Sequence, residues 1–234
     1  MKTPSTLPAG CERLERAIAH RGLASRREAK ALILSGKVRV NGVLVTEPGH
    51  GIVLDRDVIE IADTQAKESY LVYKPRGIET TKTSSGTRDL HDQFPTLKHL
   101  APIGRLDKDS EGLIIMTNDG TLTKALTRAG SSVGKTYRVV VRESVPDAAL
   151  LRMAQGIVLD KVKTKPAEVS RGSRTSFLIT LHEGRKHQIR RMCDACKLTI
   201  ESLTRIAIGH LMLGMMKPGT TKKLRTGDIA QLKV

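Results

Sequence analysis

The chain has 234 residues, 39% of them hydrophobic, which is enough for one ordinary domain and a small second one. Forty Lys and Arg against 24 Asp and Glu give a formal charge of +16, which predicts a nucleic acid or an anionic membrane as partner. The membrane is disfavoured, because no stretch approaches the roughly 20 apolar residues of a transmembrane helix and the first ten residues lack a secretory signal. Three cysteines make no disulfide framework, so we expect a cytoplasmic protein.

A compact unit is predicted over residues 11–61. Apolar residues spaced three and four apart indicate a short helix that ends at Gly22. Ser25 and Glu28 have the spacing of a capping box, which predicts the start of a second helix. Gly36 is expected to end that helix.

A β-hairpin is predicted directly after the second helix. Asn41 and Gly42 stand between two pairs of valines, and this dipeptide favours a tight turn in which both residues take positive φ. The unit therefore consists of two helices followed by a hairpin.

Basic side chains dominate this unit, with eight Lys and Arg but only three acidic residues over residues 11–45. A solvated charged face is the ordinary meaning of such a run, and a surface that contacts phosphates is the sharper alternative. On the second helix the apolar positions share one face, so the basic ones project from another. The candidates for RNA contact are Arg13, Arg26, Arg27, Lys30, Lys37 and Arg39.

This unit resembles the S4-like RNA-binding domain, in which a helix pair and a basic hairpin hold structured RNA. The match lies in residues 13–14, 23–29 and 36–42. The resemblance implies that the six basic candidates bind RNA.

A second, larger domain is expected over residues 70–234, after a polar linker at residues 62–69 and following a disordered N-terminus at residues 1–10. Strands and helices alternate irregularly, so we predict an α+β domain with a mixed, mainly antiparallel β-sheet flanked by helices. The expected strands lie at residues 70–73, 113–117, 137–142, 177–182 and 198–208, and the expected helices at residues 122–127, 146–155 and 186–196.

Residues 129–136 satisfy a loose phosphate-loop pattern. In a true phosphate loop a strand precedes the loop and a helix follows it, so that the helix N-terminus faces the phosphates. Here the preceding residues are helix-like and the following ones are β-branched. We therefore expect no ATP or GTP binding through Lys135.

Cys193 and Cys196 have the spacing of a zinc or redox pair, but two thiolates do not complete a structural zinc site. Together with Ile189 and Met192 they form a stripe at helical spacing. We therefore expect both cysteines to face the core and predict no metal site.

Three separated segments carry the chemistry. They are residues 102–120, which include Gly104-Arg105-Leu106-Asp107, then residues 135–137, and residues 183–192. Together they resemble the pseudouridine synthases, in the branch that joins an S4-like domain to a domain acting on ribosomal RNA. The resemblance covers nearly the whole chain from Arg13 onward.

The resemblance implies roles for individual residues. Asp107 corresponds to the catalytic nucleophile, and Tyr137 to the ring that stacks on the flipped base. Arg190 corresponds to the basic partner of the carboxylate, with Arg185 as the alternative. Such a guanidinium would favour the ionised carboxylate and orient it. Arg105, Arg185 and Lys135 are the expected substrate-binding residues.

Each of these residues also has a plain structural interpretation. Asp107 could cap a loop, Tyr137 could belong to the core, and Arg190 could contact a phosphate; only their combination favours catalysis. Asp109 and Glu111 receive no catalytic role. The histidines at 182, 187 and 210 are scattered, and none is expected to have the partner of a nucleophilic triad.

The predicted function is conversion of a uridine to pseudouridine in ribosomal RNA, which needs no metal or organic cofactor. Residues 108–112 favour large-subunit (23S) over small-subunit (16S) RNA. The expected partner is ribosomal RNA or a ribosome assembly intermediate, and we expect a monomer. The alternative is a non-catalytic RNA-binding or ribosome-assembly protein.

Overall fold

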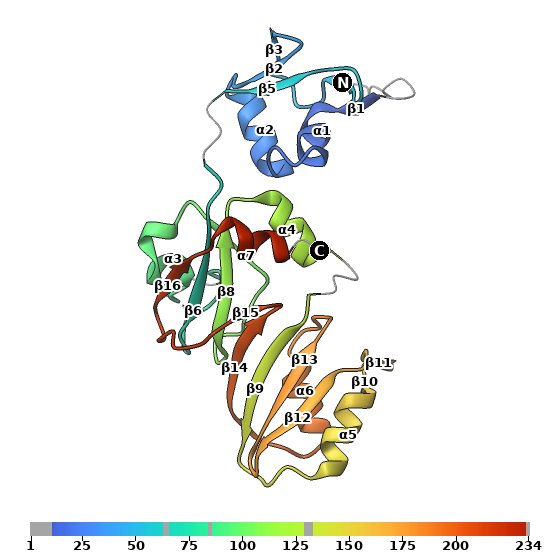
Figure 1. Cartoon of the computed structure of the whole chain (residues 1–234), viewed down its shortest axis with the longest axis vertical. Helices are drawn as coiled ribbons and strands as arrows, with labels where there is room; N and C mark the ends of the chain where they lie inside the picture. Colours follow the sequence, from blue (N-terminus) through green and yellow to red (C-terminus); the bar gives the residue numbers. More distant parts are fainter. Residues whose placement is uncertain (1–10, 63–65, 84–85, 129–132, 233–234) are drawn as a thin grey trace. The chain divides into compact units, whose positions relative to one another are not determined.

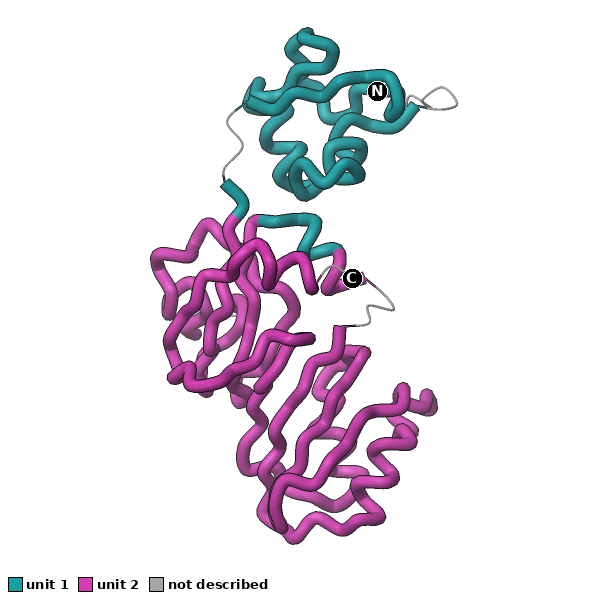
Figure 2. The backbone as a smooth tube through the Cα atoms, in the orientation of Figure 1, with its two compact units in different colours: residues 1–67, 119–124 teal, residues 68–118, 125–234 magenta. Residues whose placement is uncertain are grey.

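The computed structural model describes residues 11–62, 66–83, 86–128 and 133–232. The N-terminus predicted to be disordered lies outside these residues. The chain divides into two compact units, which Figure 2 shows in different colours: residues 1–67 with 119–124, and residues 68–118 with 125–234. Within the described residues, no helix has the length and apolar character to cross a membrane.

In the first unit, helices α1 (Leu14–His20) and α2 (Arg26–Leu34) enclose a small apolar core. Leu14, Ile18 and Ile33 are fully buried there. Leu14 and Ile18 in α1, and Ile33 and the equally buried Ala29 in α2, are each four residues apart, which places each pair on one face of its helix, as the sequence predicts.

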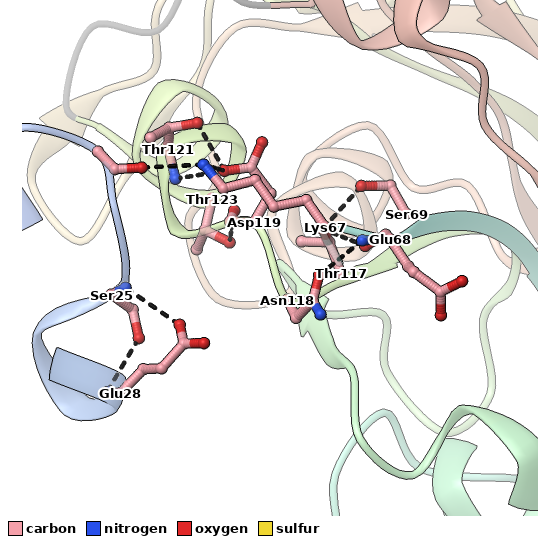
Figure 3. A network of polar contacts seen from close by, with 11 residues as sticks. Ser25, Glu28, Lys67, Glu68, Ser69, Thr117, Asn118, Asp119, Thr121 and Thr123 are labelled. Carbon is pink, nitrogen blue, oxygen red and sulfur yellow. Dashed lines mark hydrogen bonds and ion pairs between the residues drawn. The ribbon is translucent and has the colours of Figure 1, made fainter. Parts of the chain in front are cut away.

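The start of α2 has the predicted capping box, drawn in Figure 3. The side chain of Ser25 accepts a hydrogen bond from the Glu28 amide at 3.2 Å, and the Ser25 amide donates to the Glu28 carboxylate at 3.3 Å. After the helix, Gly36 takes φ +72°, a conformation that glycine adopts without strain.

The predicted hairpin is also present. Asn41 and Gly42 take φ of +51° and +79° in the turn. The strands of the hairpin are β2 (Val38–Val40) and β3 (Val43–Leu44). Three further strands that the sequence does not predict complete the unit, because runs of three residues carry little periodic signal. They are β5 (Ile59–Ile61), which pairs with β2, and β1 (Cys11–Arg13), which pairs with β4 (Gly51–Val53).

Asp119 is nearly buried at the start of α4 (Gly120–Thr127). Its carboxylate accepts hydrogen bonds from the Thr121 amide at 3.0 Å and hydroxyl at 2.6 Å, and lies 3.5 Å from the Lys67 ammonium (Figure 3). A carboxylate at this position offsets the partial positive charge of the helix N-terminus.

The second unit contains a mixed sheet of nine strands among the described residues. Strands β12, β13, β9, β14, β8, β6 and β16 follow one another across it, and β15 pairs with β14 (Figure 1). Strand β7 pairs with β8. The pairing of β8 with β14 is parallel and the others are antiparallel, so the predicted α+β fold with a mainly antiparallel sheet is confirmed. The bounds are β6 (Ser69–Lys74), β7 (Ala101–Ile103), β8 (Glu111–Thr117), β9 (Lys135–Val141), β12 (Glu168–Ser173), β13 (Ser176–Leu181), β14 (Ile200–Ile208), β15 (Leu211–Met212) and β16 (Thr221–Lys223).

The expected linker at residues 62–69 overlaps the first strand of this sheet. Ser69 already belongs to β6 and is only 2% exposed. Its hydroxyl shares a 2.7 Å hydrogen bond with that of Thr117 on β8 (Figure 3). A polar residue that resembles linker in the sequence is here satisfied inside the sheet.

Helices and short strands flank the sheet. The described elements are α3 (Leu90–Gln93), the 3₁₀ turn η1 (Pro95–Leu97), α5 (Asp147–Gln155), α6 (Gln188–Ala195), α7 (Thr226–Gln231) and the hairpin of β10 (Val158–Leu159) with β11 (Val162–Lys163).

Two hydrophobic clusters lie in this unit. One joins α5 and α6 to strands β9, β13 and β14, and includes Met153, Phe177 and Met192. The other joins α3 and η1 to β6 and β8, and includes Leu90 and Ile114. Burial of these side chains is the main favourable term that holds the helices on the sheet.

Strands β8 and β14 approach closely at Gly112. This residue takes φ +108°, and a Cβ placed on it would lie 2.3 Å from the carbonyl oxygen of Arg205. The strand register puts Lys74, Gly112, Arg205 and Tyr137 in one row across four adjacent strands. Side chains in such a row emerge on the same face of the sheet.

We predict that Gly112→Ala lowers the free energy of unfolding by more than about 3 kcal/mol, because it combines backbone strain with a clash against main-chain atoms. Gly77→Ala is the matched control: Gly77 has φ +89°, but a Cβ placed on it would have no atom within 4 Å. It should lose only about 1–2 kcal/mol, the cost of the left-handed backbone. Urea unfolding of the two variants checks this, and equal losses would contradict the role of the close approach.

Candidate active site

A cavity of about 930 Å³ opens in the second unit. It is lined by the segment that carries Asp107, by the start of β9, by the segment leading into α6, and by Arg205 of β14. Tyr137 lines it as well and packs against both hydrophobic clusters. The cavity therefore lies where the two clusters meet on the sheet.

Asp107 presents its carboxylate to two basic side chains. The imidazole Nε2 of His187 lies 3.4 Å from Oδ1, and Nε of Arg190 lies 3.8 Å from Oδ2. The carboxylate remains 41% exposed. An accessible carboxylate with both oxygens beside basic groups is held in one orientation but stays available to a substrate.

The loop that carries Asp107 is anchored on both sides of it. Before it, the buried hydroxyl of Thr80 donates to the Leu106 carbonyl oxygen at 2.7 Å and accepts from the Leu106 amide at 2.9 Å. After it, the buried Ser110 hydroxyl accepts a hydrogen bond from Nη2 of Arg190 at 3.1 Å. Arg190 thus contacts both the carboxylate and the loop behind it.

Lys74, at the end of β6, is completely buried beneath this loop. Its ammonium donates to the carbonyl oxygens of Ser110 at 2.7 Å, Pro75 at 2.9 Å and Lys108 at 3.4 Å. Burial lowers the pKa of Lys74 to about 8, and the carboxylate of Asp107 opposes that shift. This side chain supports the loop from within the protein.

The turn before α6 is organised by Gln188, which is only 4% exposed. Its side chain donates to the Glu183 carboxylate at 2.8 Å and accepts from the Arg185 amide at 3.0 Å. His187 takes φ +52° directly before the helix. Because of this tight turn, the side chain of His187, just before α6, and that of Arg190, in its first turn, both point toward Asp107.

Tyr137 and Arg205 face each other across β9 and β14. Nη1 of Arg205 donates to the Tyr137 hydroxyl at 3.5 Å, and its guanidinium carbon lies 6.0 Å from the ring centroid. Lys135, two residues earlier on β9, also lines the cavity. The pKa of Lys135 is lowered, mainly by burial and to a smaller extent by the positive charge of Arg205. The cavity floor is thus rich in partly desolvated cations.

The structure brings most of the expected site residues together. Asp107, Tyr137, Arg190, Lys135, Arg105 and Arg185 all line the cavity. Arg185, the alternative partner of Asp107, instead lies 3.5 Å from Glu183 and donates to the carbonyl oxygens of Val162 and Lys163. The geometry therefore puts Arg190, and not Arg185, beside the carboxylate.

From the sequence, His187 is not expected to have a partner, yet its imidazole lies 3.4 Å from the Asp107 carboxylate, closer than Arg190 at 3.8 Å. Lys74 and Arg205 were also not recognised. Each is a single cation in or at the end of an apolar strand, a pattern that marks a buried charge with a role. That signal was available in the sequence.

The cysteines conform to their prediction in part. Cys193 is fully buried, and burial raises the pKa of its thiol to about 12. Cys196 is only half-buried, because α6 ends at Ala195 and the chain turns there. Within the described residues, no third His, Cys, Asp or Glu stands ready to complete a metal site with them.

The phosphate-loop interpretation fails on the order of elements, as expected. Helix α4 comes before the segment and β9 begins at Lys135, although residues 129–132 lie outside the described part. In the first unit, the predicted RNA-contacting residues are exposed except Lys37, which is half-buried. The exposed ones are Arg13, Arg26, Arg27, Lys30 and Arg39.

Comparison with known families matches both parts of the chain. The model of the S4 domain matches residues 12–55, and that of RNA pseudouridylate synthases matches residues 68–195. The chain belongs to the RNA pseudouridine synthase family. Within it, the chain falls among the members that carry an S4 domain, as its sequence motifs predicted.

Two curated relatives match this chain over nearly all of its length. Ribosomal large subunit pseudouridine synthase B of Bacillus subtilis is 36% identical over 95% of this chain and 96% of that protein. The dual-specificity RNA pseudouridine synthase RluF of Escherichia coli is 34% identical over 97% of this chain and 80% of that protein. A crystal structure of a pseudouridylate synthase aligns with a TM-score of 0.71 and 27% identity, covering 94% of this chain and 99% of that one.

The buried Lys74 of this pseudouridine synthase gives a pH-dependent prediction. Its pKa is about 8 in the folded protein against an ordinary value of 10.5. Between these values the unfolded state binds more protons, so the contribution of Lys74 to the free energy of unfolding increases with pH and is lost as pH falls through 8. From pH 7 to pH 10 the free energy of unfolding of the wild type should therefore increase relative to that of Lys74→Met. Urea unfolding checks this, and a constant difference would contradict it.

Proposed function

We propose that this protein converts a uridine of ribosomal RNA to pseudouridine, with Asp107 as the nucleophile. The observation that carries the proposal is the accessible Asp107 carboxylate, held between His187 and Arg190 in a cavity that also contains Tyr137. The names of the two curated relatives support RNA as the substrate, and that of the Bacillus subtilis protein supports the large subunit.

The reaction matches these side chains. The bond between the ribose C1′ and N1 of uracil breaks, a bond from C1′ to C5 forms, a proton leaves C5, and N1 gains one. No electrons are exchanged with a redox partner, so the balance requires no cofactor. A carboxylate can act on the ribose as a nucleophile, and Arg190 and His187 orient it.

The uridine must leave its helix or loop to reach a carboxylate inside a cavity. A flipped base is commonly stacked on an aromatic ring. Among the described residues that line the cavity, Tyr137 is the one Phe, Tyr or Trp, and we assign that role to it. Arg105 and Lys186 are exposed cations that also line the cavity, suited to the flanking phosphates.

The first unit is proposed to bind RNA through its exposed basic residues. The proposed domains are residues 11–61 for this function and 70–234 for catalysis. We further propose that the protein acts as a monomer in the cytoplasm, on ribosomal RNA or an assembly intermediate. The alternative remains a non-catalytic RNA-binding or ribosome-assembly protein, and the two functions differ at Asp107.

We predict that Asp107→Asn lowers pseudouridine formation at least about 1,000-fold, because the amide is not a nucleophile, while RNA affinity changes little. Asp109→Asn is the matched control, since Asp109 is exposed and does not line the cavity. The substrate is large-subunit RNA from cells lacking this protein, with pseudouridines mapped before and after treatment. The enzymatic proposal would be refuted if the wild-type protein formed no pseudouridine in any ribosomal or transfer RNA.

For the first unit, we predict that Arg26→Ala with Arg27→Ala weakens RNA binding and reduces the slope of log affinity against log salt by about 1–2, because each phosphate contact releases condensed counterions. Arg56→Ala is the control, an exposed arginine paired with Asp57 and lying outside α2. Filter binding over a range of salt concentrations measures the slope. An unchanged slope in the double variant would count against phosphate contacts by α2.

A further inference from the structure

Arg205 is a buried cation whose hydrogen-bonding capacity is not used up by the residues that the structure describes. It is only 3% exposed in the middle of β14. Nε donates to the Leu113 carbonyl oxygen at 2.6 Å and Nη1 to the Tyr137 hydroxyl at 3.5 Å. Nη2 is buried and has no hydrogen-bond partner among the residues that the structure describes.

An unpaired donor on a buried guanidinium is costly, because the group has lost its water and gained nothing in exchange. Buried polar groups are nearly always satisfied, so an exception points to a missing partner. Arg205 lines the same cavity as Asp107 and Tyr137, and its Nη2 is covered by protein atoms in this structure, so a bound substrate can supply that partner when the guanidinium turns toward the cavity.

The missing partner must be an acceptor, because a guanidinium has donors only. Phosphates are best met by the exposed cations Arg105 and Lys186, whereas Arg205 lies among buried residues of the sheet and contacts the hydroxyl of Tyr137. A base stacked on that ring would bring its edge toward the guanidinium. The acceptors on the edge of uracil are its carbonyl oxygens O2 and O4.

We propose that Nη2 of Arg205 donates a hydrogen bond to a carbonyl oxygen of the flipped uracil, which makes Arg205 a further substrate-contacting residue. This inference rests on the proposed function, since it requires a uridine in the cavity. The register supports it, because Arg205 and Tyr137 are paired across β14 and β9 and emerge on one face of the sheet.

The rearrangement itself fits a donor at this position. For C5 to take the place of N1 at the ribose, uracil turns about the axis through N3 and C6, which exchanges O2 with O4. A fixed donor beside the ring then meets a carbonyl oxygen both before and after the turn. Arg205 would hold the detached ring in both orientations, so its loss should affect the rate more than RNA affinity.

The test compares wild type, Arg205→Met and Arg205→Lys on a synthetic large-subunit RNA fragment containing the mapped target uridine. The target is uridine, 2-thiouridine or 4-thiouridine, since sulfur is a weak acceptor, and a fourth RNA carries a methylphosphonate 5′ to the target. Arg138→Met is the matched control, because Arg138 is exposed and neighbours Tyr137 on β9. Single-turnover rates and dissociation constants are measured for each combination of protein variant and RNA.

We expect Arg205→Met to lower the single-turnover rate on uridine about 10- to 100-fold, as for loss of a charged hydrogen bond, with RNA affinity nearly unchanged. At least one thio substitution should slow the wild type about tenfold and slow Arg205→Met much less, because the contact is already lost. The sensitive position identifies which oxygen is bound first. Arg138→Met should behave as wild type.

Thio substitutions that slow wild type and Arg205→Met by equal factors would overturn the inference. It would also be overturned if the methylphosphonate were the one RNA change whose effect differs between wild type and Arg205→Met, because Arg205 would then contact the phosphate and not the base. Should Arg205→Met fail to fold by circular dichroism, Arg205→Lys decides, since its shorter ammonium cannot occupy the Nη2 position: undiminished thio sensitivity overturns the inference. The wild type must first convert the uridine of the unmodified fragment to pseudouridine. If it does not, the proposed function fails, and the inference about Arg205 fails with it; if it does, the thio results test Arg205 alone.

Discussion

The close approach of β8 and β14 at Gly112 and Arg205 is the constraint on which the second unit depends. It is the parallel contact in an otherwise antiparallel sheet, and it requires a residue without a side chain. Through it, the sheet around β6 joins the sheet around β9, each with its own hydrophobic cluster. The loop bearing Asp107 enters β8 at this junction, which is why it faces Tyr137.

The junction also determines the electrostatics of the cavity. Lys74 and Arg205 are brought into one row of the sheet and are buried there, while Lys135 lies at the edge of the same region. Buried cations without matching carboxylates are unfavourable unless they bind carbonyl oxygens or ligands. Lys74 is satisfied by the main chain of the loop, whereas one donor of Arg205, Nη2, has no hydrogen-bond partner among the described residues.

What could be predicted from the sequence depended on contacts between near neighbours. The capping box of Ser25 with Glu28 and the turn at Asn41 involve residues a few positions apart, so local chemistry determines them. The roles of Lys74 and Arg205 could not be derived in this way, since their carbonyl partners lie 36 and 92 residues away. The family resemblance named Arg190, but its distance from Asp107 required the folded chain.

The turn that carries Asp107 is held largely through main-chain atoms. The Lys108 carbonyl oxygen accepts from the Gly77 amide at 2.8 Å, and the Ser110 carbonyl oxygen accepts from Lys74. The side chains of Lys108 and Asp109 are exposed, and none of the hydrogen bonds that anchor the turn within the described residues comes from them. The position of the Asp107 carboxylate therefore depends on the path of the main chain through residues 108–110 more than on which side chains stand at 108 and 109.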